Sequence, residues 1–382
     1  MKDRVALSIL GRAISRGRLD VTFPDGSTAV LEGSEPGPAA SVTLYMPGVI
    51  VGALAGGALS LLESYLEREY DTDDLAAFLL FAASNQQAWV KDRPRLYRWG
   101  RAASRRRDTR HTNVDTMASH YNLGNDFYAK WLDPSMTYSS ARFEGDTDLA
   151  DAQHAKYQSL VSMADIRPGQ RILEIGTGWG GFALHLARMG CHVTTLTIAE
   201  EQLAFVKSRI ADEALFGTID AHLLDFAHVE GTFDRVVSVE MIESIDETRW
   251  QELFHVIDRS LAPGGVMAMQ AIIIEDEFWE SYRTNPDFIQ RYIFPGGMLP
   301  SSELLRRMVT EAGLSWHRDE TFGLDYARTL ATWHQRFDDA WPEIRQQDFD
   351  ERFRRMWKSY LAYCEAGFRI GRINVVQFAA HR

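Results

Sequence analysis

The first candidate for a ligand-binding site is a glycine-rich segment, Gly176-Thr177-Gly178-Trp179-Gly180-Gly181. It follows a short apolar run, residues 171–175, and precedes a helical pattern over residues 182–189. Glycines at a strand-to-helix turn let the backbone approach a ligand closely, and ligands of open α/β sheets lie at the carboxyl ends of the strands. Glu174 stands two positions before the first glycine, and Asp225 follows another strand-like run. The spacing alone is a weak signal, and these neighbouring acids narrow the choice of ligand.

A parallel α/β sheet must position these residues, because apolar strands alternate with amphipathic helices from residue 167 onward. Strands are predicted at 171–175, 192–196, 235–239 and 266–274. The pattern resembles the class I S-adenosylmethionine-dependent methyltransferases, which have a Rossmann-like sheet. The competing interpretation, a nicotinamide-binding Rossmann domain, expects Gly-x-Gly-x-x-Gly and an acid ending the second strand. Here that strand ends in Thr194-Thr195-Leu196-Thr197, without an acid, which favours the methyltransferase.

Six separated motifs carry a narrower resemblance. They are, in order, His120–Tyr128, Leu132–Ser139, Leu173–Gly181, Glu240–Glu243, Tyr292–Gly297 and Tyr363–Phe368. Through them, residues 115–382 resemble the cyclopropane-fatty-acyl-phospholipid synthase family. The resemblance implies transfer of the methyl carbon of S-adenosylmethionine to a cis double bond of an unsaturated acyl chain, followed by closure of a cyclopropane ring. It also implies a helical insert around residues 275–370 over the acyl site, and the amino-terminal extension favours a membrane phospholipid as substrate.

The same resemblance implies which residues hold S-adenosylmethionine. They are Tyr138, Ser139, Glu174, Gly176, Gly178, Thr197, Gln202 and Asp225. Thr197 and Gln202 would replace the acid that usually binds the ribose. The alternatives for these two are an ordinary strand end and an exposed helix residue.

The implied reaction places physical demands on the site. An isolated alkene is a poor nucleophile, so the sulfonium methyl must be held in line with the double bond at near-attack distance. Methyl transfer leaves a carbocation that water would capture, so the acyl chain must lie in a dry tunnel with aromatic walls. Loss of a proton from the transferred methyl closes the ring, and that step needs a base.

For the base, the family resemblance implies a bicarbonate ion held by Cys, Glu, His and Tyr side chains and a backbone amide. Glu243 matches the Glu, Tyr326 matches the Tyr, and Ile272 falls at the amide. Two positions depart from the pattern: Ser140 stands at the Cys and Gln270 at the His. Both can still donate hydrogen bonds to an anion. Alternatively, Glu243 itself approaches the cation, or the product is a methylene- or methyl-branched chain instead of a ring.

Composition excludes several other classes of protein. The chain has 382 residues, a net charge of −12 and two cysteines. An acidic chain is a poor general nucleic-acid binder, and two cysteines cannot make a disulfide framework. We expect a cytoplasmic protein with no metal site. An N- or O-methyltransferase for a small molecule or protein, and a lipid-binding protein with a degenerate cofactor site, are the other hypotheses.

Membrane contact is expected from the amino-terminal part. We predict a small α/β domain at residues 1–105, containing a short antiparallel sheet, and a catalytic domain at residues 106–382. Residues 44–62 carry no charge, and residues 91–110 contain nine Lys or Arg against two Asp. The first segment fits a buried or interfacial element better than a membrane span, and the second fits a solvated linker or a patch attracted to anionic lipid. We expect peripheral contact with the inner face of the membrane, and a homodimer would raise the avidity of that contact.

Overall fold

The computed structural model describes residues 2–11, 14–86 and 123–382, which belong to two compact units. The described residues of unit 1 are those up to 86 together with 285–295 and 341–370. Unit 2 contains residues 123–284, 296–340 and 371–382. The division therefore differs from the expected single boundary near residue 105, because two later segments belong with the amino-terminal residues. The expected insert around 275–370 is accordingly divided between the units.

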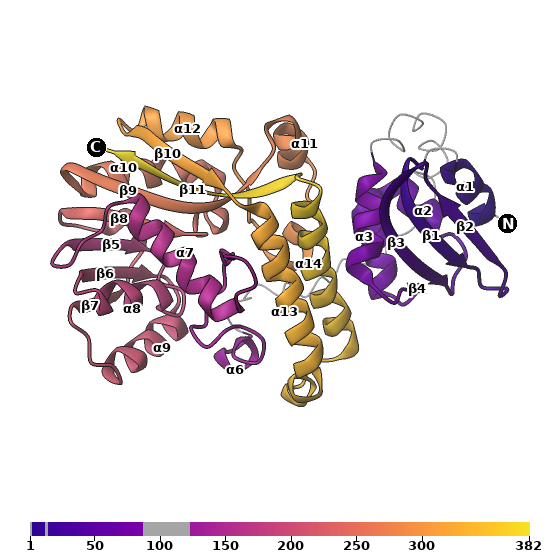
Figure 1. Cartoon of the computed structure of the whole chain (residues 1–382), viewed down its shortest axis with the longest axis horizontal. Helices are drawn as coiled ribbons and strands as arrows, with labels where there is room; N and C mark the ends of the chain where they lie inside the picture. Colours follow the sequence, from indigo (N-terminus) through magenta and orange to yellow (C-terminus); the bar gives the residue numbers. More distant parts are fainter. Residues whose placement is uncertain (1, 12–13, 87–122) are drawn as a thin grey trace. The chain divides into compact units, whose positions relative to one another are not determined.

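Unit 2 is built on a seven-stranded sheet with the order β10-β11-β9-β8-β5-β6-β7 (Figure 1). Its strands are β5 (Arg171–Ile175), β6 (His192–Thr197), β7 (Thr218–Leu223), β8 (Phe233–Val239), β9 (Leu261–Ile274), β10 (Ser315–Thr321) and β11 (Ile373–His381). Strands β5 to β9 pair in parallel, and β11 pairs antiparallel with both β9 and β10. The four predicted strands are confirmed. Because β5 lies between β6 and β8, the strand order reverses there, and such a switch point is where α/β sheets bind ligands.

Two apolar cores cover the faces of this sheet. Successive side chains of β5 alternate between them: Leu173 packs with α10 and α12, whereas Ile172 packs with α7 and α8. The alternation follows from the two-residue period of a strand, and burial on both faces explains why β5 is apolar at Ile172, Leu173 and Ile175. The helices of this unit are α6 (Asn125–Tyr128), α7 (Leu149–Met163), α8 (Gly181–Arg188), α9 (Glu200–Ala211), α10 (Trp250–Ser260), α11 (Trp279–Thr284), α12 (Ser302–Glu311) and α13 (Gly323–Ile344), of which residues 341–344 count in unit 1.

Unit 1 contains a four-stranded sheet of order β2-β1-β3-β4. Its strands are β1 (Arg16–Thr22), β2 (Thr28–Glu32), β3 (Glu35–Leu44) and β4 (Tyr70–Asp71). A turn at residues 24–27 joins β1 and β2 into an antiparallel hairpin. Strand β3, however, pairs parallel with β1, so the sheet is mixed and not purely antiparallel as expected. Sequence alternation cannot distinguish the two pairings, because side chains alternate in both.

Helices from distant parts of the sequence complete unit 1. They are α1 (Lys2–Gly11), α2 (Val49–Leu66), α3 (Leu75–Ser84), a π-helical turn (Ile289–Ile293) and α14 (Glu351–Arg369). Asp74 caps α3 by accepting a hydrogen bond from the backbone of Ala77. Helix α14 packs against α3, and its buried Arg355 donates to the carbonyls of Tyr65 and Tyr70.

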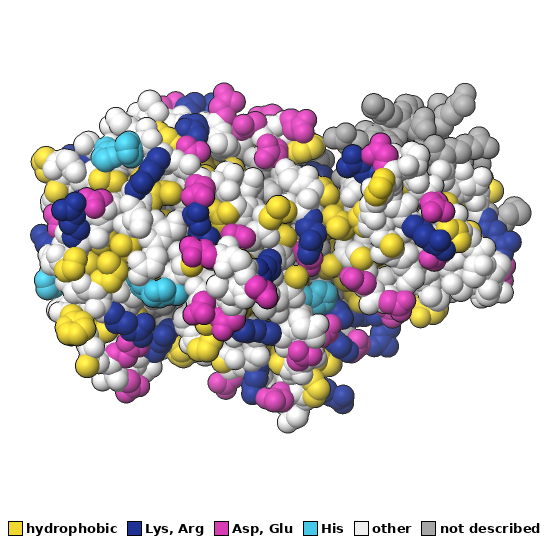
Figure 2. Space-filling model, viewed as in Figure 1, with side chains coloured by type: hydrophobic (Ala, Val, Ile, Leu, Met, Phe, Trp, Pro, Cys, Tyr) yellow, Lys and Arg dark blue, Asp and Glu magenta, His cyan; other side chains and the backbone are white. Residues whose placement is uncertain are grey.

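The uncharged segment at 44–62 runs from the last residue of β3 through a short loop into most of α2, which is interrupted at Gly57. Across the described ranges 2–11, 14–86 and 123–382, no helix is both long enough and apolar enough to cross a membrane. The basic stretch at 91–110 lies outside the described residues. On the face displayed in Figure 2, acidic and basic side chains are interspersed.

Candidate active site

The carboxyl ends of β5, β8 and β9 bring the predicted site residues together. Strand β5 leads into the glycine-rich loop, β8 into Glu240, and Gln270 on β9 pairs with the last residue of β8. At Gly176 the backbone is left-handed, with φ 99°, and a Cβ there would come within 2.9 Å of Cγ of Met241. Glycine is therefore required by both the conformation and the close approach of the residue after Glu240. The cofactor loop and the carboxylates after β8 are neighbours.

The glycine loop is also held by an aromatic side chain. Trp179 is buried, and its indole donates to Oδ1 of Asn125 in α6 at 2.7 Å. Gly178 and Gly180 both have positive φ, and Gly180 immediately precedes α8. The loop thus presents the amino-terminal end of α8 at the switch point.

Glu174 lies behind this loop, 2% exposed. Its carboxylate accepts a hydrogen bond from the hydroxyl of Thr195, which also pairs with the hydroxyl of Thr177. Burial raises the pKa of Glu174 to about 8, although the Thr195 bond opposes the rise. The acid therefore links the loop to β6.

Thr197 and Gln202, which the resemblance assigns to the ribose, lie side by side. The hydroxyl of Thr197 donates to Oε1 of Gln202 at 2.8 Å, and both side chains are buried. Gln202 is therefore not the exposed helix residue of the alternative interpretation. The two side chains follow β6, beside the loop that follows β5, where a ribose hydroxyl could exchange hydrogen bonds with them.

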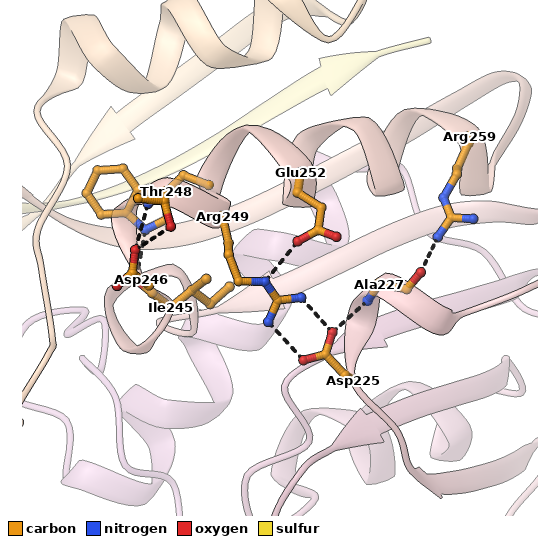
Figure 3. Close-up of polar contacts among 9 residues, drawn as sticks. Asp225, Ala227, Ile245, Asp246, Thr248, Arg249, Glu252 and Arg259 are labelled. Atoms are coloured by element: carbon orange, nitrogen blue, oxygen red, sulfur yellow. Dashed lines mark hydrogen bonds and ion pairs between the residues drawn. The ribbon is translucent and has the colours of Figure 1, made fainter.

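Asp225 is held by an arginine that the sequence reasoning did not identify (Figure 3). Arg249 donates to both carboxylate oxygens, at 2.8 and 3.0 Å, and the backbone of Ala227 donates as well. Hydrogen bonding to Arg249 is the main reason that the pKa of Asp225 is lowered. Arg249 also binds Glu252, so a carboxylate on either side fixes its guanidinium. The pairing fixes the orientation of Asp225.

Tyr138 and Ser139 enter the site from the chain segment after α6. The ring of Tyr138 lies 5.3 Å from that of Trp333 and 5.5 Å from that of Trp131. The hydroxyl of Ser139 accepts from Nζ of Lys156 at 2.6 Å. Lys156 is fully buried, and burial lowers its pKa to about 7. Its position in the middle of α7 gave no sign of this role in the sequence.

Glu240 is the centre of the polar site. Its Oε1 accepts from the backbone N–H of Ser140 at 2.9 Å and from Nε2 of Gln270 at 2.6 Å, and its Oε2 accepts from the hydroxyl of Tyr326 at 2.7 Å. Burial raises the pKa of Glu240, while Lys156 and these three donors oppose the rise. The sequence reasoning placed Glu240 in a motif but gave it no role. The sequence did contain a signal. Ser140, Gln270 and Tyr326 were all assigned to one anion, and a carboxylate side chain can be that anion as readily as a bound ion.

Glu243 lies one turn further along. Its Oε1 accepts from the backbone N–H of Ile272, the amide that was expected to bind bicarbonate, and its Oε2 is buried without a hydrogen-bond partner. Burial, and then the charge of Glu240, raise the pKa of Glu243 to about 8. Two carboxyl groups thus occupy the site in unlike environments.

A chain of buried polar groups fixes the orientation of Gln270. Gln377 on β11 donates to Oε1 of Gln270 at 2.9 Å, and Ser159 and then Arg142 continue the chain at 2.7 and 2.8 Å. With Oε1 of Gln270 occupied, its Nε2 faces Glu240. The hydroxyl of Ser140 donates to the carbonyl of Ala141, so Ser140 serves the site through its backbone.

The donors assigned to bicarbonate are therefore engaged by the chain itself. Ser140, Gln270 and Tyr326 donate to Glu240, and Ile272 donates to Glu243. The residues present do not fit the expected ion. By contrast, the glycine loop, the Thr197–Gln202 pair and Tyr138 fit an S-adenosyl cofactor at the switch point.

Known proteins resemble this chain over most of its length. The profile of the mycolic acid cyclopropane synthetase family matches residues 108–378. Tuberculostearic acid methyltransferase UfaA1 of Mycobacterium tuberculosis is 33% identical, over 99% of this chain and 91% of that protein. Cyclopropane-fatty-acyl-phospholipid synthase of Escherichia coli K12 is 34% identical, over 92% of this chain and 90% of that protein.

The crystal structure of mycolic acid cyclopropane synthase CmaA1 with SAH and CTAB has a TM-score of 0.64 and 28% identity, covering 69% of this chain and 96% of that one. Coclaurine N-methyltransferase, at 19% identity and a TM-score of 0.66, shares the fold. The predicted class I methyltransferase fold is confirmed. The chain is an S-adenosylmethionine-dependent methyltransferase and belongs to the mycolic acid cyclopropane synthetase family.

Proposed function

We propose that this enzyme transfers the methyl carbon of S-adenosylmethionine to the cis double bond of an unsaturated acyl chain in a membrane phospholipid, and closes a cyclopropane ring by removing a proton. The observation that carries the proposal is the hydrogen-bonded carboxylate after β8, next to the glycine loop. A heteroatom methyltransferase has no carbocation to protect and no methyl proton to remove.

The cofactor residues of this proposal are those predicted from the sequence. Tyr138, Ser139, Glu174, Gly176, Gly178, Thr197, Gln202 and Asp225 would hold S-adenosylmethionine. When bound, it supplies an electrophilic methyl group. Tyr326, Ser140, Gln270 and Glu243 would form the polar side of the reaction site.

Aromatic rings suit the cation that the reaction forms. The rings of Tyr138, Trp131 and Trp333 contact one another. The ring centroids of Tyr326 and Trp333 are 6.2 Å apart. Aromatic faces attract positive charge and exclude water, which would otherwise capture the carbocation. The cluster therefore supports carbon methylation.

A branched product is the second candidate. After methyl transfer, a hydride can shift from the methylated carbon to the neighbouring cationic carbon. Loss of a proton from the methyl group then leaves a methylene group on the acyl chain. An added reductase would convert this methylene group to a methyl branch. The match to UfaA1, a protein named for tuberculostearic acid, over 99% of this chain favours it. Both routes remove a proton from the transferred methyl group, so they need the same base.

The test is mass spectrometry of phospholipid fatty acids after incubation of the purified enzyme with S-adenosylmethionine and vesicles of cis-monounsaturated phospholipid. We expect a mass gain of one CH₂ per acyl chain. A product that resists mild hydrogenation contains a ring, whereas uptake of H₂ identifies the methylene chain. No gain on any lipid, together with methylation of amines or hydroxyls, would refute lipid methylation.

We also propose peripheral contact with the inner face of the membrane through unit 1. Tyr45 and Met46, between β3 and α2, are each 53% exposed, and such side chains suit an interfacial position. Replacing both by serine should weaken flotation with phospholipid vesicles. Val30→Ser is the matched control, because Val30 is equally exposed in the same unit. Equal flotation of all three proteins would refute the contact.

A further inference from the structure

The polar site holds a carboxylate where the sequence led us to expect a bound ion. We propose that Glu240 supplies the anion of this site as part of the chain, taking the place of bicarbonate and accepting the proton lost from the transferred methyl group. This inference rests on the proposed carbon methylation and names its base. It predicts an enzyme that works without bicarbonate.

The donors around Glu240 are arranged as for a planar anion. A backbone N–H, a side-chain amide and a phenol converge on its two oxygens at 2.6 to 2.9 Å. Oε1 accepts two of these bonds and Oε2 accepts one. Since each carboxylate oxygen offers about two acceptor sites, Oε2 keeps a site for a proton. The carboxylate is thus held in place and still able to act as a base.

The backbone at Glu240 shows that this placement is built into the fold. Glu240 has φ 47°, a conformation that residues other than glycine seldom adopt. Its N–H donates to the carbonyl of Gln270 at 2.8 Å, which fixes the turn at the end of β8. Strained conformations of this kind persist where the surrounding structure enforces them, often at functional sites. Glycine would occupy the same conformation without strain and would leave the side-chain space empty.

The surrounding charges separate the roles of the two carboxyl groups. The facing groups are the Lys156 ammonium, the Tyr326 hydroxyl and the Glu243 carboxyl. Glu240 has three donors and the nearby cation, all of which favour its charged form. Glu243 has one backbone donor and a charged neighbour, so it is the one that stays protonated near neutral pH. Glu240 is therefore the base of the pair.

The proton transfer balances without any further reactant. The sulfonium methyl would bond to one alkene carbon as its bond to sulfur breaks, which would release S-adenosylhomocysteine and leave the neighbouring carbon cationic. A C–H bond of that methyl then breaks. Its electrons form the last C–C bond of the ring, or the methylene double bond after a hydride shift, and the proton goes to Oε2 of Glu240.

The first experiment compares the wild-type enzyme in bicarbonate-free buffer under nitrogen with the same assay after addition of bicarbonate. We expect equal rates of lipid methylation. Product formation in either arm supports the proposed function by itself, so a failure of the inference is distinguishable from a failure of that function. A wild-type rate that disappears without bicarbonate and returns with it would overturn the inference.

The second experiment uses variants that either fill or empty the space of the Glu240 side chain. Glu240→Gln should lower kcat by at least about 100-fold, the scale of a general base, and bicarbonate should not restore it because the amide still fills the site. Glu240→Gly should be equally slow, but bicarbonate, formate or acetate should restore activity with saturation. Glu243→Gln should retain much more activity than Glu240→Gln.

Two controls separate chemistry from folding. Asp165→Gly likewise replaces an acidic residue by glycine at a left-handed position, φ 49°, on the exposed turn before β5, and should leave activity unchanged. Calorimetric binding of S-adenosylmethionine should be retained in Glu240→Gln. Should Glu240→Gly not fold, the Gln variant decides alone, and near-wild-type methylation by Glu240→Gln would contradict the proposal.

Discussion

Glu240 and Glu243 are three residues apart, yet the fold gives their carboxyl groups unlike partners. Three donors and a cation surround Glu240, whereas one backbone amide meets Glu243. Coupled acids in a shared site titrate as a pair, and the one whose charged form has more donors and a nearby cation ionises first. The different surroundings make Glu240 the base and Glu243 its neutral neighbour, although both residues are glutamates.

Replacing Lys156 tests whether its positive charge lowers the pKa of Glu240. Activity should fall as pH falls through the folded pKa of Glu240, because the base must be deprotonated, and burial places that pKa above the ordinary glutamate value. Lys156→Met removes the cation that opposes this rise, so the acid limb of the kcat profile should move to higher pH. At a fixed pH on that limb, activity would fall about tenfold for each unit by which the pKa of Glu240 rises.

The pH–rate profile of wild type and variant, measured with saturating S-adenosylmethionine, checks this expectation. Lys207→Met offers a control on the surface helix α9, where the cation does not face Glu240. An acid limb unmoved by the loss of Lys156 would show that the lysine does not act on the base.

At the scale of elements, the turn after β5 is the tightest constraint on the cofactor side. Gly176→Ala would add a Cβ within 2.9 Å of Met241 in a left-handed conformation. We expect a loss of S-adenosylmethionine affinity and a destabilisation of about 1–3 kcal/mol. Gly169→Ala is the matched control, since Gly169 has φ 82° but open space around its Cβ position.

Calorimetry and thermal unfolding of both variants make the comparison. The control should lose some stability from its backbone strain and keep its affinity for the cofactor. If Gly169→Ala and Gly176→Ala weaken cofactor binding equally, close packing against Met241 is not what shapes the loop.

The pairing of β9 with β11 predicts a positioning role for Gln377. This buried amide fixes Gln270, which in turn donates to Glu240. Gln377→Leu should lower kcat while leaving the KM for S-adenosylmethionine unchanged, at a cost of about 1–3 kcal/mol for the unpaired group. In a double-mutant cycle with Gln270→Leu the effects should be strongly non-additive. Additive effects would place Gln377 outside the chain of bonds to the base.

At the scale of the whole molecule, unit 1 depends on residues far apart in the sequence. Arg355 of α14 binds the carbonyls of Tyr65 and Tyr70 and stacks 3.6 Å above the ring of Tyr65. Arg355→Met removes both buried hydrogen bonds and the contact with the Tyr65 ring, so we expect a loss of about 2–4 kcal/mol in unfolding free energy.

Arg352→Met on the same helix is the control. Its partner Glu67 lies 3.5 Å away at the surface, and exposed pairs contribute under about 1 kcal/mol. Urea unfolding followed by tryptophan fluorescence measures both variants. Equal stabilities would mean that the buried arginine does not hold α14 in unit 1.

The sequence by itself determined the methyltransferase sheet, because short apolar runs alternate with amphipathic helices and the glycines require particular backbone conformations, and both signals are local. The family resemblance also assigned Thr197 and Gln202 to the same part of the cofactor, and the two residues are close in sequence. The sequence could not show that Glu240 replaces an ion, that Lys156 is buried in the site, or that Arg249 holds Asp225, because those facts depend on side chains from separate strands and helices meeting. Nor could it show that residues 285–295 and 341–370 belong with unit 1. Packing between distant segments decides these, and hydrophobic periodicity records that a face is buried but not what buries it.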